Sequence, residues 1–469
     1  MTMHTEIIIG PPGTGKTTRL LDILDRELKA GVPPNKIAFM SFTNKAVDEA
    51  TDRAVSRCNF KKSELVYFRT VHSMAFFSLG LKRTQVMQLA DYRKIGDHLG
   101  LRFTAGSYED GPAPPGKNPG DHYRFIDSLA RAKMANPKEI WDGLDHDGLN
   151  WYEFDRYRET VKAYKKNTGL YDFSDMLRYF PKPLDLEVCI IDEAQDLSTA
   201  QWSFISELTK NVTRMYIGGD DDQAIFEWGG ADVNKFINLE GERTVLDTSY
   251  RIPASVHKVA SGIASKIQQR TEKTYHSRSA KGSVEYSLDV DSIDMSSGTW
   301  MLLARNSYLL GELAAVARQQ GYSYSVKGVS SVKKADTDAI ECWEKHRKGL
   351  ELGDKEHAIL DLYTSNTASD APWFKAFDKM SVEQTEYYLA LRRRGESLLK
   401  TPRIKINTIH GSKGGEADHV VLVTDMAYTT WNATNLNQDS EHRVWYVGAT
   451  RAKESLNIIM PRARYHYPI

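Results

Sequence analysis

The stretch Glu6–Thr18, E-I-I-I-G-P-P-G-T-G-K-T-T, decides the fold of this 469-residue chain. Three isoleucines predict a short buried strand, a glycine-rich turn follows, and Leu20, Leu21 and Leu24 predict the apolar face of a helix. Strand, glycine turn and helix in that order are the context in which G-x-x-x-x-G-K-T forms a phosphate-binding loop. A chance match inside an ordinary glycine turn is the alternative, and the flanking elements count against it.

Such a loop binds phosphate for physical reasons. Its backbone N–H groups and the positive end of the following helix face the phosphate chain. Gly13 and Gly15 let the backbone turn and come close without a Cβ, while Lys16 reaches the β- and γ-phosphates and Thr17 offers a hydroxyl to Mg²⁺. We therefore expect a bound nucleotide with Mg²⁺. The predicted nucleotide-binding residues are Gly10, Pro11, Pro12, Gly13, Thr14, Gly15, Lys16, Thr17 and Thr18.

Composition narrows the class of protein. Hydrophobic residues make up 41% and charged residues 26%, as in ordinary globular proteins. Lys+Arg and Asp+Glu are 62 each, which argues against a wholly basic nucleic-acid coat protein but allows a local basic groove. The cysteines, Cys58, Cys189 and Cys342, are far apart and predict neither a disulfide framework nor a zinc site. With no signal-peptide or membrane-spanning pattern, we expect a cytoplasmic protein without membrane partners.

The alternation of apolar strands and helices predicts an α/β fold with two parallel-sheet lobes, each interrupted by a mainly helical insertion. We expect the first lobe at 1–75 and 172–249 around an insertion at 76–171, and the second at 250–326 and 403–469 around a short insertion at 327–402. The predicted strands of the lobes include Leu65–Phe68 and Leu456–Ile459, and Asn44 is expected to cap a helix. The Gly- and Pro-rich stretch Ala105–Asp121 predicts a mobile loop, either a solvated connector or a segment that touches duplex.

A second acidic element, I-I-D-E-A-Q-D, follows the predicted buried strand Val188–Ile191. Asp192 at the end of that strand is placed to hold the metal bound by Thr17, and Glu193 to orient and deprotonate an attacking water. The alternative is a cluster of acidic residues that caps the next helix. The phosphate-binding loop in the same chain favours the catalytic interpretation.

The loop G-G-D-D-D-Q-A-I-F-E-W carries the next candidates. Gln223 is placed after a predicted strand, where it can sense the γ-phosphate. Phe226 and Trp228 alternate, so we expect both rings on one side as a stacking platform for bases. A solvated glutamine and two core aromatics are the alternatives.

Two arginines in the second half, Arg251 in T-S-Y-R-I-P and Arg451 in V-G-A-T-R-A-K, are candidate arginine fingers. Such arginines stabilise the charge of the transition state and make closure of the lobes depend on the γ-phosphate. Tyr250 beside Arg251 is expected to stack on adenine. Isolated arginines are more often members of surface ion pairs.

Taken together, the motifs resemble those of the UvrD/Rep (PcrA-like) family of superfamily-1 DNA helicases, in the family's order from residue 10 to about 453. The matching motifs are G-P-P-G-T-G-K-T-T, S-F-T-N-K-A, T-V-H-S, D-F-S-D-M-L, I-I-D-E-A-Q-D, G-D-D-D-Q-A-I-F-E-W, S-Y-R, I-N-T-I-H-G-S-K-G-G-E and W-Y-V-G-A-T-R-A-K. Kinases, AAA+ proteins and GTPases share only the first of these.

The resemblance implies two RecA-like P-loop NTPase lobes with ATP between them, and 3′-to-5′ movement on single-stranded DNA. It implies that Gln223, Arg251 and Arg451 contact the γ-phosphate and that Glu416 contacts the ribose. Groups that face DNA or couple the two sites would be Phe42, Thr43, Asn44, Thr70, His72, Phe226, Trp228 and His410. The expected partners are single-stranded DNA and single-/double-strand junctions, with a single-strand binding protein or a replication, repair or recombination protein as candidates, in a bacterial or phage-infected cell.

Four departures from the family pattern modify these expectations. Only nine residues precede Gly10 and none is the usual adenine-reading glutamine, so base specificity is relaxed or adenine is held mainly by Tyr250. Gly229 replaces an arginine of W-R-G-A, and Gly415 replaces the apolar residue of K-G-L-E. The second insertion is short and a C-terminal extension is missing. This compact plan indicates a phage or mobile-element version.

We expect an ATP-dependent 3′-to-5′ DNA helicase that unwinds duplex; the alternatives are a translocase that strips proteins from DNA with little unwinding and a nucleotide-switched DNA-binding scaffold without turnover. Intact Lys16, Glu193 and Gln223, with both arginines, favour an enzyme with turnover.

Overall fold

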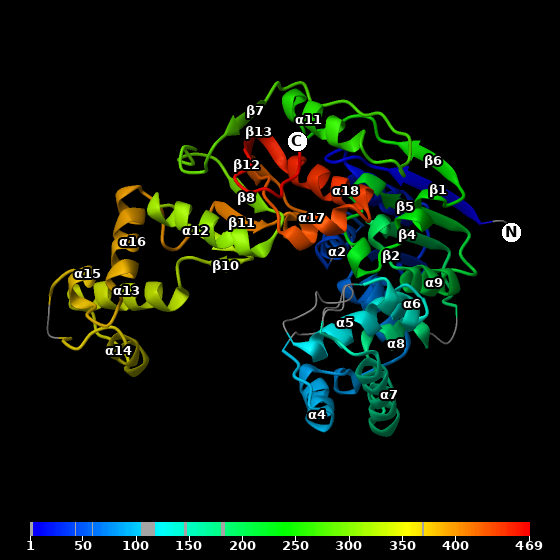
Figure 1. Ribbon diagram of the computed structural model, residues 1–469, viewed down its shortest axis with the longest axis horizontal. Coiled ribbons are helices and arrows are strands. Elements are labelled where there is room, and N and C mark those ends of the chain that lie inside the picture. The colour runs from blue at the N-terminus through cyan, green and yellow to red at the C-terminus, as the bar shows by residue number, and fades with distance from the viewer. Residues whose placement is uncertain are drawn as a thin grey trace. The chain divides into compact units, whose positions relative to one another are not determined.

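Two sheets organise the chain, one in each of two units (Figure 1). The computed structural model describes residues 3–42, 44–58, 60–104, 118–144, 148–179, 183–367 and 370–469. Unit 1 comprises Met1–Tyr250 and Gln268–His276, and unit 2 comprises Arg251–Ile267 and Ser277–Ile469. Helices flank both sheets, so the predicted α/β class with two RecA-like lobes is confirmed. Within the described ranges, no helix combines the length and apolar character needed to cross a membrane.

The sheet of unit 1 has six parallel strands in the order β3-β2-β4-β5-β1-β6. They are β1 (His4–Ile9), β2 (Ile37–Ser41), β3 (Phe68–Thr70), β4 (Val188–Asp192), β5 (Arg214–Gly219) and β6 (Glu242–Val245). The expected strand Leu65–Phe68 was placed too early, because Phe68 N donates to Leu65 O at 3.2 Å and closes a turn there. Parallel pairing brings the carboxyl ends of all six strands to one edge of the sheet.

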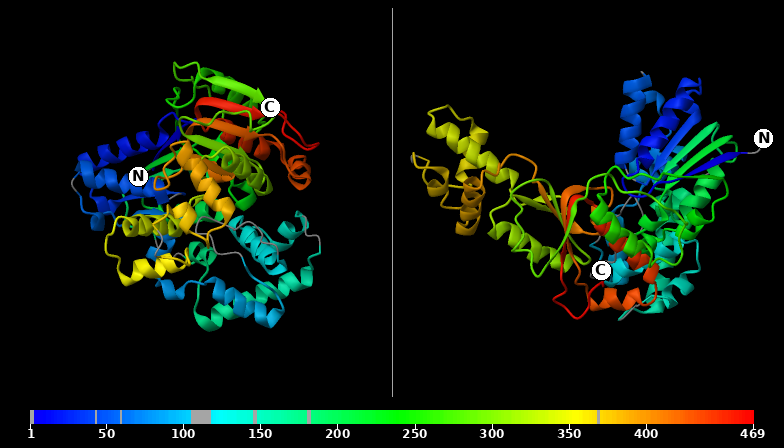
Figure 2. Two further views of the ribbon diagram at one scale, coloured as in Figure 1. Left: turned by 90° about the vertical axis from the view of Figure 1, so that its left-hand side faces the viewer. Right: turned by 90° about the horizontal axis from the view of Figure 1, so that it is seen from above.

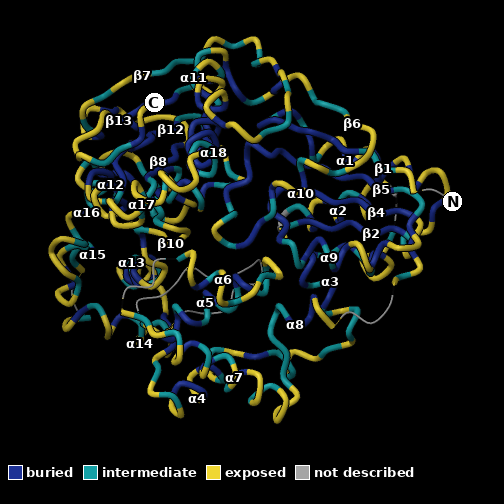
Figure 3. The backbone as a smooth tube through the Cα atoms, turned by 45° about the vertical axis from the view of Figure 1, so that its right-hand side comes forward, coloured by how far each residue is buried: buried dark blue, intermediate teal, exposed yellow. Residues whose placement is uncertain are grey.

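Helices cover both faces of this sheet. They are α1 (Lys16–Lys29), α2 (Asn44–Cys58), α3 (Val71–Ser78), α8 (Phe173–Arg178), α9 (Thr199–Leu208) and α10 (Val233–Ile237). Ile8 packs with α1 and α2, whereas its neighbours Ile7 and Ile9 pack with α3, α8 and α9, as the two-residue period of a strand requires. The residues of β2 and β4, and those of β5 after Arg214, are accordingly buried (Figure 3). Asn44 is the first residue of α2 and not its cap, which corrects that expectation.

The insertion of unit 1 is helical, as predicted, and its helices form a group of their own (Figure 1). They are α4 (Leu89–Leu99), α5 (Pro119–Ala132), α6 (Pro137–Asp142) and α7 (Trp151–Thr168). Their core is aromatic, with Tyr123, Trp141 and Phe154 in mutual ring contact. Most of the expected loop Ala105–Asp121 lies outside the described residues. Its last part is helical, and the buried Asp121 accepts a 2.7 Å hydrogen bond from the Thr104 hydroxyl.

The motif D-F-S-D fastens this insertion to the sheet domain. Asp172 caps α8, and Arg131 of α5 binds both Asp172 at 2.6 Å and Asp175 at 2.5 Å. Lys165 of α7 binds the same two carboxylates at 2.7 and 2.8 Å. Two helices of the insertion therefore meet α8 through one network of ion pairs.

Unit 2 has a seven-stranded sheet in the order β10-β9-β11-β8-β12-β13-β7, parallel except for β10 against β9. The strands are β7 (Ser283–Ser287), β8 (Trp300–Ala304), β9 (Tyr324–Val326), β10 (Val329–Ser330), β11 (Ile404–Thr408), β12 (Ala417–Val423) and β13 (Ala452–Ile459). The last strand is longer than the expected Leu456–Ile459, because Ala452 already pairs with Ala417. The flanking helices are α11 (Ala254–Ala264), α12 (Leu310–Gln319), α17 (Tyr428–Thr434) and α18 (Gln438–Ala449).

The second insertion is also helical and extends away from the strands of its own sheet (right-hand view of Figure 2, yellow and orange). Its helices are α13 (Lys334–Arg347), α14 (Asp354–Asp361), α15 (Trp373–Ala376) and α16 (Val382–Arg393). Trp343, Trp373 and Tyr388 are buried in a cluster that continues to Leu302 of β8, so the insertion shares the core of unit 2.

Candidate active site

The phosphate-binding loop lies at the carboxyl end of β1, as the sequence predicts. Gly13 and Gly15 have φ of 73° and 82°, which a residue with a Cβ rarely adopts. The loop is held by hydrogen bonds from Thr14 Oγ1 to Pro11 O at 2.8 Å and from Gly10 N to Gly219 O at 2.9 Å. No described side chain caps the start of α1. The first N–H groups of that helix therefore point to a site that suits an anion.

Lys16 joins the loop to the acidic element. Its Nζ lies 2.7 Å from Glu193 Oε1 and 3.5 Å from Asp192 Oδ1. Burial alone would lower the pKa of Lys16, but the two carboxylates outweigh burial and raise that pKa above its ordinary value. The site therefore holds a permanent cation where the loop opens.

Thr17 and Asp192 form the candidate metal site. Thr17 Oγ1 donates a 2.8 Å hydrogen bond to Asp192 Oδ2, and Asp192 is the last residue of β4. The pKa of Asp192 lies above its ordinary value, because burial and the neighbouring Glu193 carboxylate raise it by more than Lys16 lowers it. A hydroxyl beside a carboxylate is a donor set that fits Mg²⁺. Among the described residues, no three His, Cys, Asp or Glu side chains gather to hold a metal alone, so phosphate or water oxygens would complete the shell.

Glu193 has the geometry expected of a general base held in place. Its φ of 55° and ψ of 39° are unusual for a residue other than glycine. Its side chain is 26% exposed, so water can reach it. The alternative of a helix cap fails for the next helix, because α9 is capped by Ser198, whose Oγ accepts from Gln201 N at 3.2 Å.

Gln195 is a residue that the sequence interpretation missed. It lies in the short 3₁₀ helix η4 (Ala194–Asp196), fully buried. Its Nε2 donates to Glu193 Oε2 at 2.6 Å and its Oε1 accepts from Asp220 N at 3.0 Å. Gln195 thus connects the end of β4 to the end of β5. Its position two residues after Glu193 in D-E-A-Q-D was the available signal.

Gln223 lies at the end of a second 3₁₀ helix, η5 (Asp221–Gln223). It is buried, and its Nε2 donates to Asp220 Oδ2 at 2.7 Å. The alternative of a solvated loop glutamine therefore does not hold. Glu193 and Gln223 belong to one hydrogen-bonded chain that runs through Gln195 and Asp220.

The candidate base-stacking residues lie beside this loop. Phe42 stacks on Phe226 at 5.3 Å between ring centroids, and Phe226 meets Trp228 edge to face at 6.5 Å. Phe226 and Trp228 were expected on one side because they alternate as in a strand. The structure corrects that reason, since Glu227–Gly229 is a 3₁₀ helix (η6). Trp228 also stacks on Phe125 and is 37% exposed, unlike a core residue.

The other candidates near DNA in unit 1 have different surroundings. Thr43 lies outside the described residues, and Asn44 is exposed at the start of α2. Thr70 is buried and caps α3, its hydroxyl accepting from Ser73 N at 3.3 Å. His72 is buried against the ring of Phe173, and burial lowers its pKa to about 4. Thr70 thus caps α3 and His72 packs α3 against Phe173 of α8, and their place beside DNA stays a prediction.

Tyr250, the candidate adenine contact, follows a residue that is tied to the phosphate-binding loop. Ser249 Oγ donates to Pro12 O at 2.7 Å, and Tyr250 N donates to Gly13 O at 2.8 Å. Tyr250 itself is 76% exposed. A loop-anchored backbone with an exposed ring is the arrangement that stacking on a base requires.

In unit 2, Arg251 and Glu416 bind each other. Arg251 Nε donates to Glu416 Oε2 at 2.7 Å, and Lys453 Nζ lies 3.6 Å from Glu416 Oε1. Burial acts to raise the pKa of Glu416, but the two cations lower it. The predicted finger and the predicted ribose contact thus form one ion-pair cluster.

Arg451 is buried at the end of α18. Its guanidinium donates to Val447 O at 2.9 Å and to Gly415 O at 3.1 Å, which ties α18 to the K-G-G-E loop. His410 begins the 3₁₀ helix η8 (His410–Ser412) before that loop. A Cβ on Gly415 would lie 2.6 Å from Met301 Cε, so Met301 fills the space of the apolar residue that the family pattern has there.

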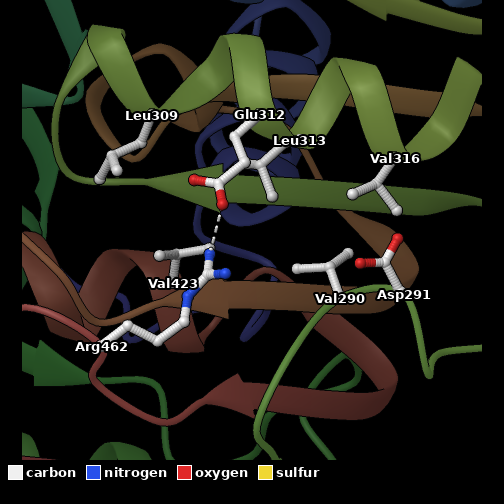
Figure 4. Close-up of a pocket in the computed structure, with 8 residues that line it drawn as sticks. All are labelled: Val290, Asp291, Leu309, Glu312, Leu313, Val316, Val423 and Arg462. Carbon is white, nitrogen blue, oxygen red and sulfur yellow. Dashed lines mark hydrogen bonds and ion pairs between the residues drawn. The ribbon is translucent and has the colours of Figure 1, made fainter.

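A small pocket of unit 2 lies apart from these residues. Arg462 and Glu312 bridge it at 2.7 Å (Figure 4). Its volume of about 20 Å³ suits a water molecule and not a nucleotide. The lining residues are Val290, Asp291, Leu309, Glu312, Leu313, Val316, Val423 and Arg462.

Comparisons with known families give two matches. The model of the UvrD/REP helicase N-terminal domain matches residues 2–243, and the model of the UvrD-like helicase C-terminal domain matches residues 155–463. The two matches together span most of the chain.

Similar curated proteins include the ATP-dependent DNA helicase Rep of Buchnera aphidicola subsp. Baizongia pistaciae, 24% identical over 300 residues, 59% of this chain and 43% of that protein. DNA helicase II of Rickettsia typhi is 27% identical over 319 residues, 60% of this chain and 46% of that protein. This chain spans about half, or less than half, of the length of the curated relatives that it matches. A solved structure of the PRRSV helicase aligns with 98% of this chain and with 53% of the PRRSV chain, at 13% identity. The TM-score of 0.36 is too low to bear on the fold.

Proposed function

Because this chain belongs to the UvrD/Rep helicase family, we propose that it is an ATP-dependent DNA helicase that moves 3′ to 5′ on single-stranded DNA and unwinds duplex. One observation carries the proposal beyond family membership. The hydrogen-bonded chain Glu193–Gln195–Asp220–Gln223 links the candidate base to the candidate γ-phosphate sensor, with Lys16 bound to Glu193. Through these hydrogen bonds, gain or loss of the γ-phosphate beside Lys16 and Glu193 can alter the position of Gln223 in the loop after β5.

In this proposal the residues of unit 1 carry out ATP hydrolysis. Lys16 and the first N–H groups of α1 bind the phosphates, and Glu193 accepts a proton from the attacking water. Thr17 and Asp192 would hold Mg²⁺, which when bound neutralises phosphate charge. Gln195 and Asp220 orient Glu193 and Gln223.

The residues of unit 2 enter from the family resemblance. We propose that Arg251 and Arg451 stabilise the γ-phosphate during hydrolysis and that Glu416 contacts the ribose. The ion pair between Arg251 and Glu416 supports a shared role, since a nucleotide that binds one side chain disturbs the other. We also propose that the segment boundaries predicted from the sequence are those of the working subdomains, except that Tyr250 and Gln268–His276, expected in the second lobe, belong to unit 1.

Single-stranded DNA is the proposed track. The contact of Phe42, Phe226 and Trp228, with Trp228 partly exposed, supports stacking of bases regardless of sequence. Junctions of single- and double-stranded DNA, a single-strand binding protein and a replication, repair or recombination protein are the proposed partners. A bacterial or phage-infected cytoplasm is the proposed location.

The test of this function is an unwinding assay with tailed duplexes. The full chain, ATP and Mg²⁺ are mixed with one labelled duplex that carries either a 3′ or a 5′ single-stranded tail. We expect strand separation from the 3′-tailed duplex only. Separation from the 5′ tail alone would contradict the proposed direction.

A second candidate function is a translocase that displaces proteins from DNA with little unwinding. Gly229 in place of an arginine and the short insertion that holds α13–α16 favour it. Displacement of streptavidin from a biotinylated 3′ or 5′ end, measured beside unwinding, separates the two. Efficient unwinding by the monomer would exclude the second candidate.

A further inference from the structure

A short segment of the chain, Gln268–His276, belongs to unit 1 although the residues on both sides of it belong to unit 2. It carries Lys273, whose side chain is 0% exposed. Lys273 Nζ lies 2.8 Å from Asp220, 2.6 Å from Asp221 and 3.1 Å from Asp222. One ammonium group thus contacts three consecutive carboxylates in the loop that leads to Gln223.

A second cation from the same segment completes the cluster. Arg270 binds Asp222 in a bidentate manner, with Nε–Oδ1 at 3.0 Å and an Nη–Oδ2 distance of 2.5 Å. Thr271 N donates to Asp221 Oδ2 at 2.6 Å. The three aspartates are 0% exposed, and buried carboxylates side by side repel one another strongly unless cations compensate them. Lys273 and Arg270 therefore compensate the three carboxylates and stabilise this shape of the loop after β5.

Asp220 connects the cluster to the active site. Its Oδ1 faces Lys273, and its Oδ2 accepts from Gln223 Nε2 at 2.7 Å. Its backbone N–H donates to Gln195, which in turn binds Glu193. Burial acts to lower the pKa of Lys273, but the carboxylates outweigh it and raise that pKa, so the ammonium keeps its charge.

We propose that Lys273, assisted by Arg270, is a positioning residue for ATP hydrolysis that acts through Asp220 to hold Gln223 in place. This inference rests on the proposed function, since it assigns Gln223 to the γ-phosphate. It adds a residue from outside every motif noted in the sequence. The segment Gln268–His276 is continuous in sequence with residues of unit 2 at both ends.

A purely structural role is the competing explanation, in which the ion pairs only fasten the segment to unit 1. A double-mutant cycle between Lys273 and Gln223 separates the two explanations. The variants are Lys273→Met, Gln223→Ala and the double variant, in the full chain with ATP, Mg²⁺ and a single-stranded oligonucleotide. The measured quantities are kcat, KM for ATP and the affinity for ADP, which has no γ-phosphate.

We expect Lys273→Met to lower kcat by up to about 100-fold, the cost of a displaced catalytic group. The affinity for ADP should stay within about twofold of the wild type, because the contacts of Lys16 and the loop remain. In the Gln223→Ala background, Lys273→Met should change kcat by no more than about twofold. Losses that multiply in the double variant, or a wild-type kcat for Lys273→Met, would overturn the inference.

Lys165→Met is the matched control. Lys165 also joins two carboxylates, Asp172 and Asp175, but belongs to the helical insertion. Lys165→Met should lower stability, and all variants are also measured without DNA, where its kcat should stay near the wild-type value. If Lys273→Met does not fold, Asp220→Asn takes its place in the same cycle, with the same outcomes.

The two levels of the proposal fail in different ways. Wild-type protein without ATP turnover in the presence of Mg²⁺ and DNA contradicts the proposed function, and the inference falls with it. The inference alone is contradicted if the wild type hydrolyses ATP, Gln223→Ala lowers the rate, and both Lys273→Met and Asp220→Asn leave the rate unchanged.

Discussion

Thr17 donates a hydrogen bond to Asp192 at 2.8 Å, although 175 residues separate them in the sequence. The strand order explains the contact, since β1 and β4 both pair with β5 and end at the same edge of the sheet. The hydroxyl and the carboxylate form one candidate magnesium site at the mouth of the phosphate-binding loop.

Removing the Thr17 hydroxyl should weaken activation by Mg²⁺. Thr17→Ala removes the proposed metal ligand and the hydrogen bond to Asp192, whereas Thr17→Ser keeps the hydroxyl and is the matched control. We expect about 10- to 100-fold more Mg²⁺ for half-maximal ATP hydrolysis in Thr17→Ala. The measurement is ATPase rate against Mg²⁺ concentration. Equal Mg²⁺ requirements for the two variants would contradict this metal site.

Glu193→Gln should abolish turnover while ATP still binds. The amide cannot accept a proton from water, which costs about 10²- to 10⁴-fold in kcat for a general base. Glutamine keeps the size of the side chain, but its one amide oxygen can accept from only one of the two donors, Lys16 Nζ and Gln195 Nε2, so binding is measured beside turnover. Binding is followed with a fluorescent ATP analogue and turnover by phosphate release. A variant that hydrolyses ATP at the wild-type rate would refute the assignment of the base.

His72 should make stability depend on pH between about 4 and 6.5. Burial lowers its pKa from 6.5 to about 4, so within that range the unfolded chain binds the proton more readily than the folded chain. Stability from this group is complete above pH 6.5 and is lost as the pH falls, by about 3 kcal/mol in total.

Urea unfolding at pH 7 and pH 4.5 measures the effect of His72. His72→Gln should reduce the loss between the two pH values, even if the variant is less stable at pH 7. His98→Gln, at an exposed position of α4, should leave the loss in place. An unchanged loss in His72→Gln would mean that another group is responsible.

Trp228→Ala should weaken binding of single-stranded DNA by about 1–3 kcal/mol, the usual worth of one stacked base. Trp431→Ala is a matched control, since Trp431 is 38% exposed and Trp228 is 37% exposed. Fluorescence anisotropy of a labelled oligonucleotide measures both. Equal losses in the two variants would indicate a general effect of removing a surface tryptophan and not a stacking platform.

The sequence was sufficient for the parts of the site that depend on local pattern and on parallel topology. The phosphate-binding loop follows from Gly13, Gly15 and the strand before them. Asp192 could be placed beside Thr17 because strand ends meet at one edge of a parallel sheet. The two lobes and their helical insertions followed from the alternation of strands and helices.

The missing parts depend on contacts between distant segments. Asp221 and Lys273 are 52 residues apart, and three aspartates in a loop look solvated when read alone. Asp121 was expected in a loop because glycines and prolines precede it, but it begins a helix and binds Thr104. Thr70 was expected near DNA, and its hydroxyl also caps α3, which the sequence interpretation did not include. For Asp221 and Asp121 the partner lies in another segment, whereas the cap of Thr70 is local, to Ser73 N, and could have been read from T-V-H-S.

ATP hydrolysis with and without single-stranded DNA tests the central claim most directly. Phosphate release by the full chain is measured with Mg²⁺ and ATP, first alone and then with a single-stranded oligonucleotide, an RNA of the same sequence or the duplex. The account predicts that single-stranded DNA increases turnover by at least about tenfold, a shift of about 1.4 kcal/mol in the barrier. A rate that no nucleic acid changes would contradict it.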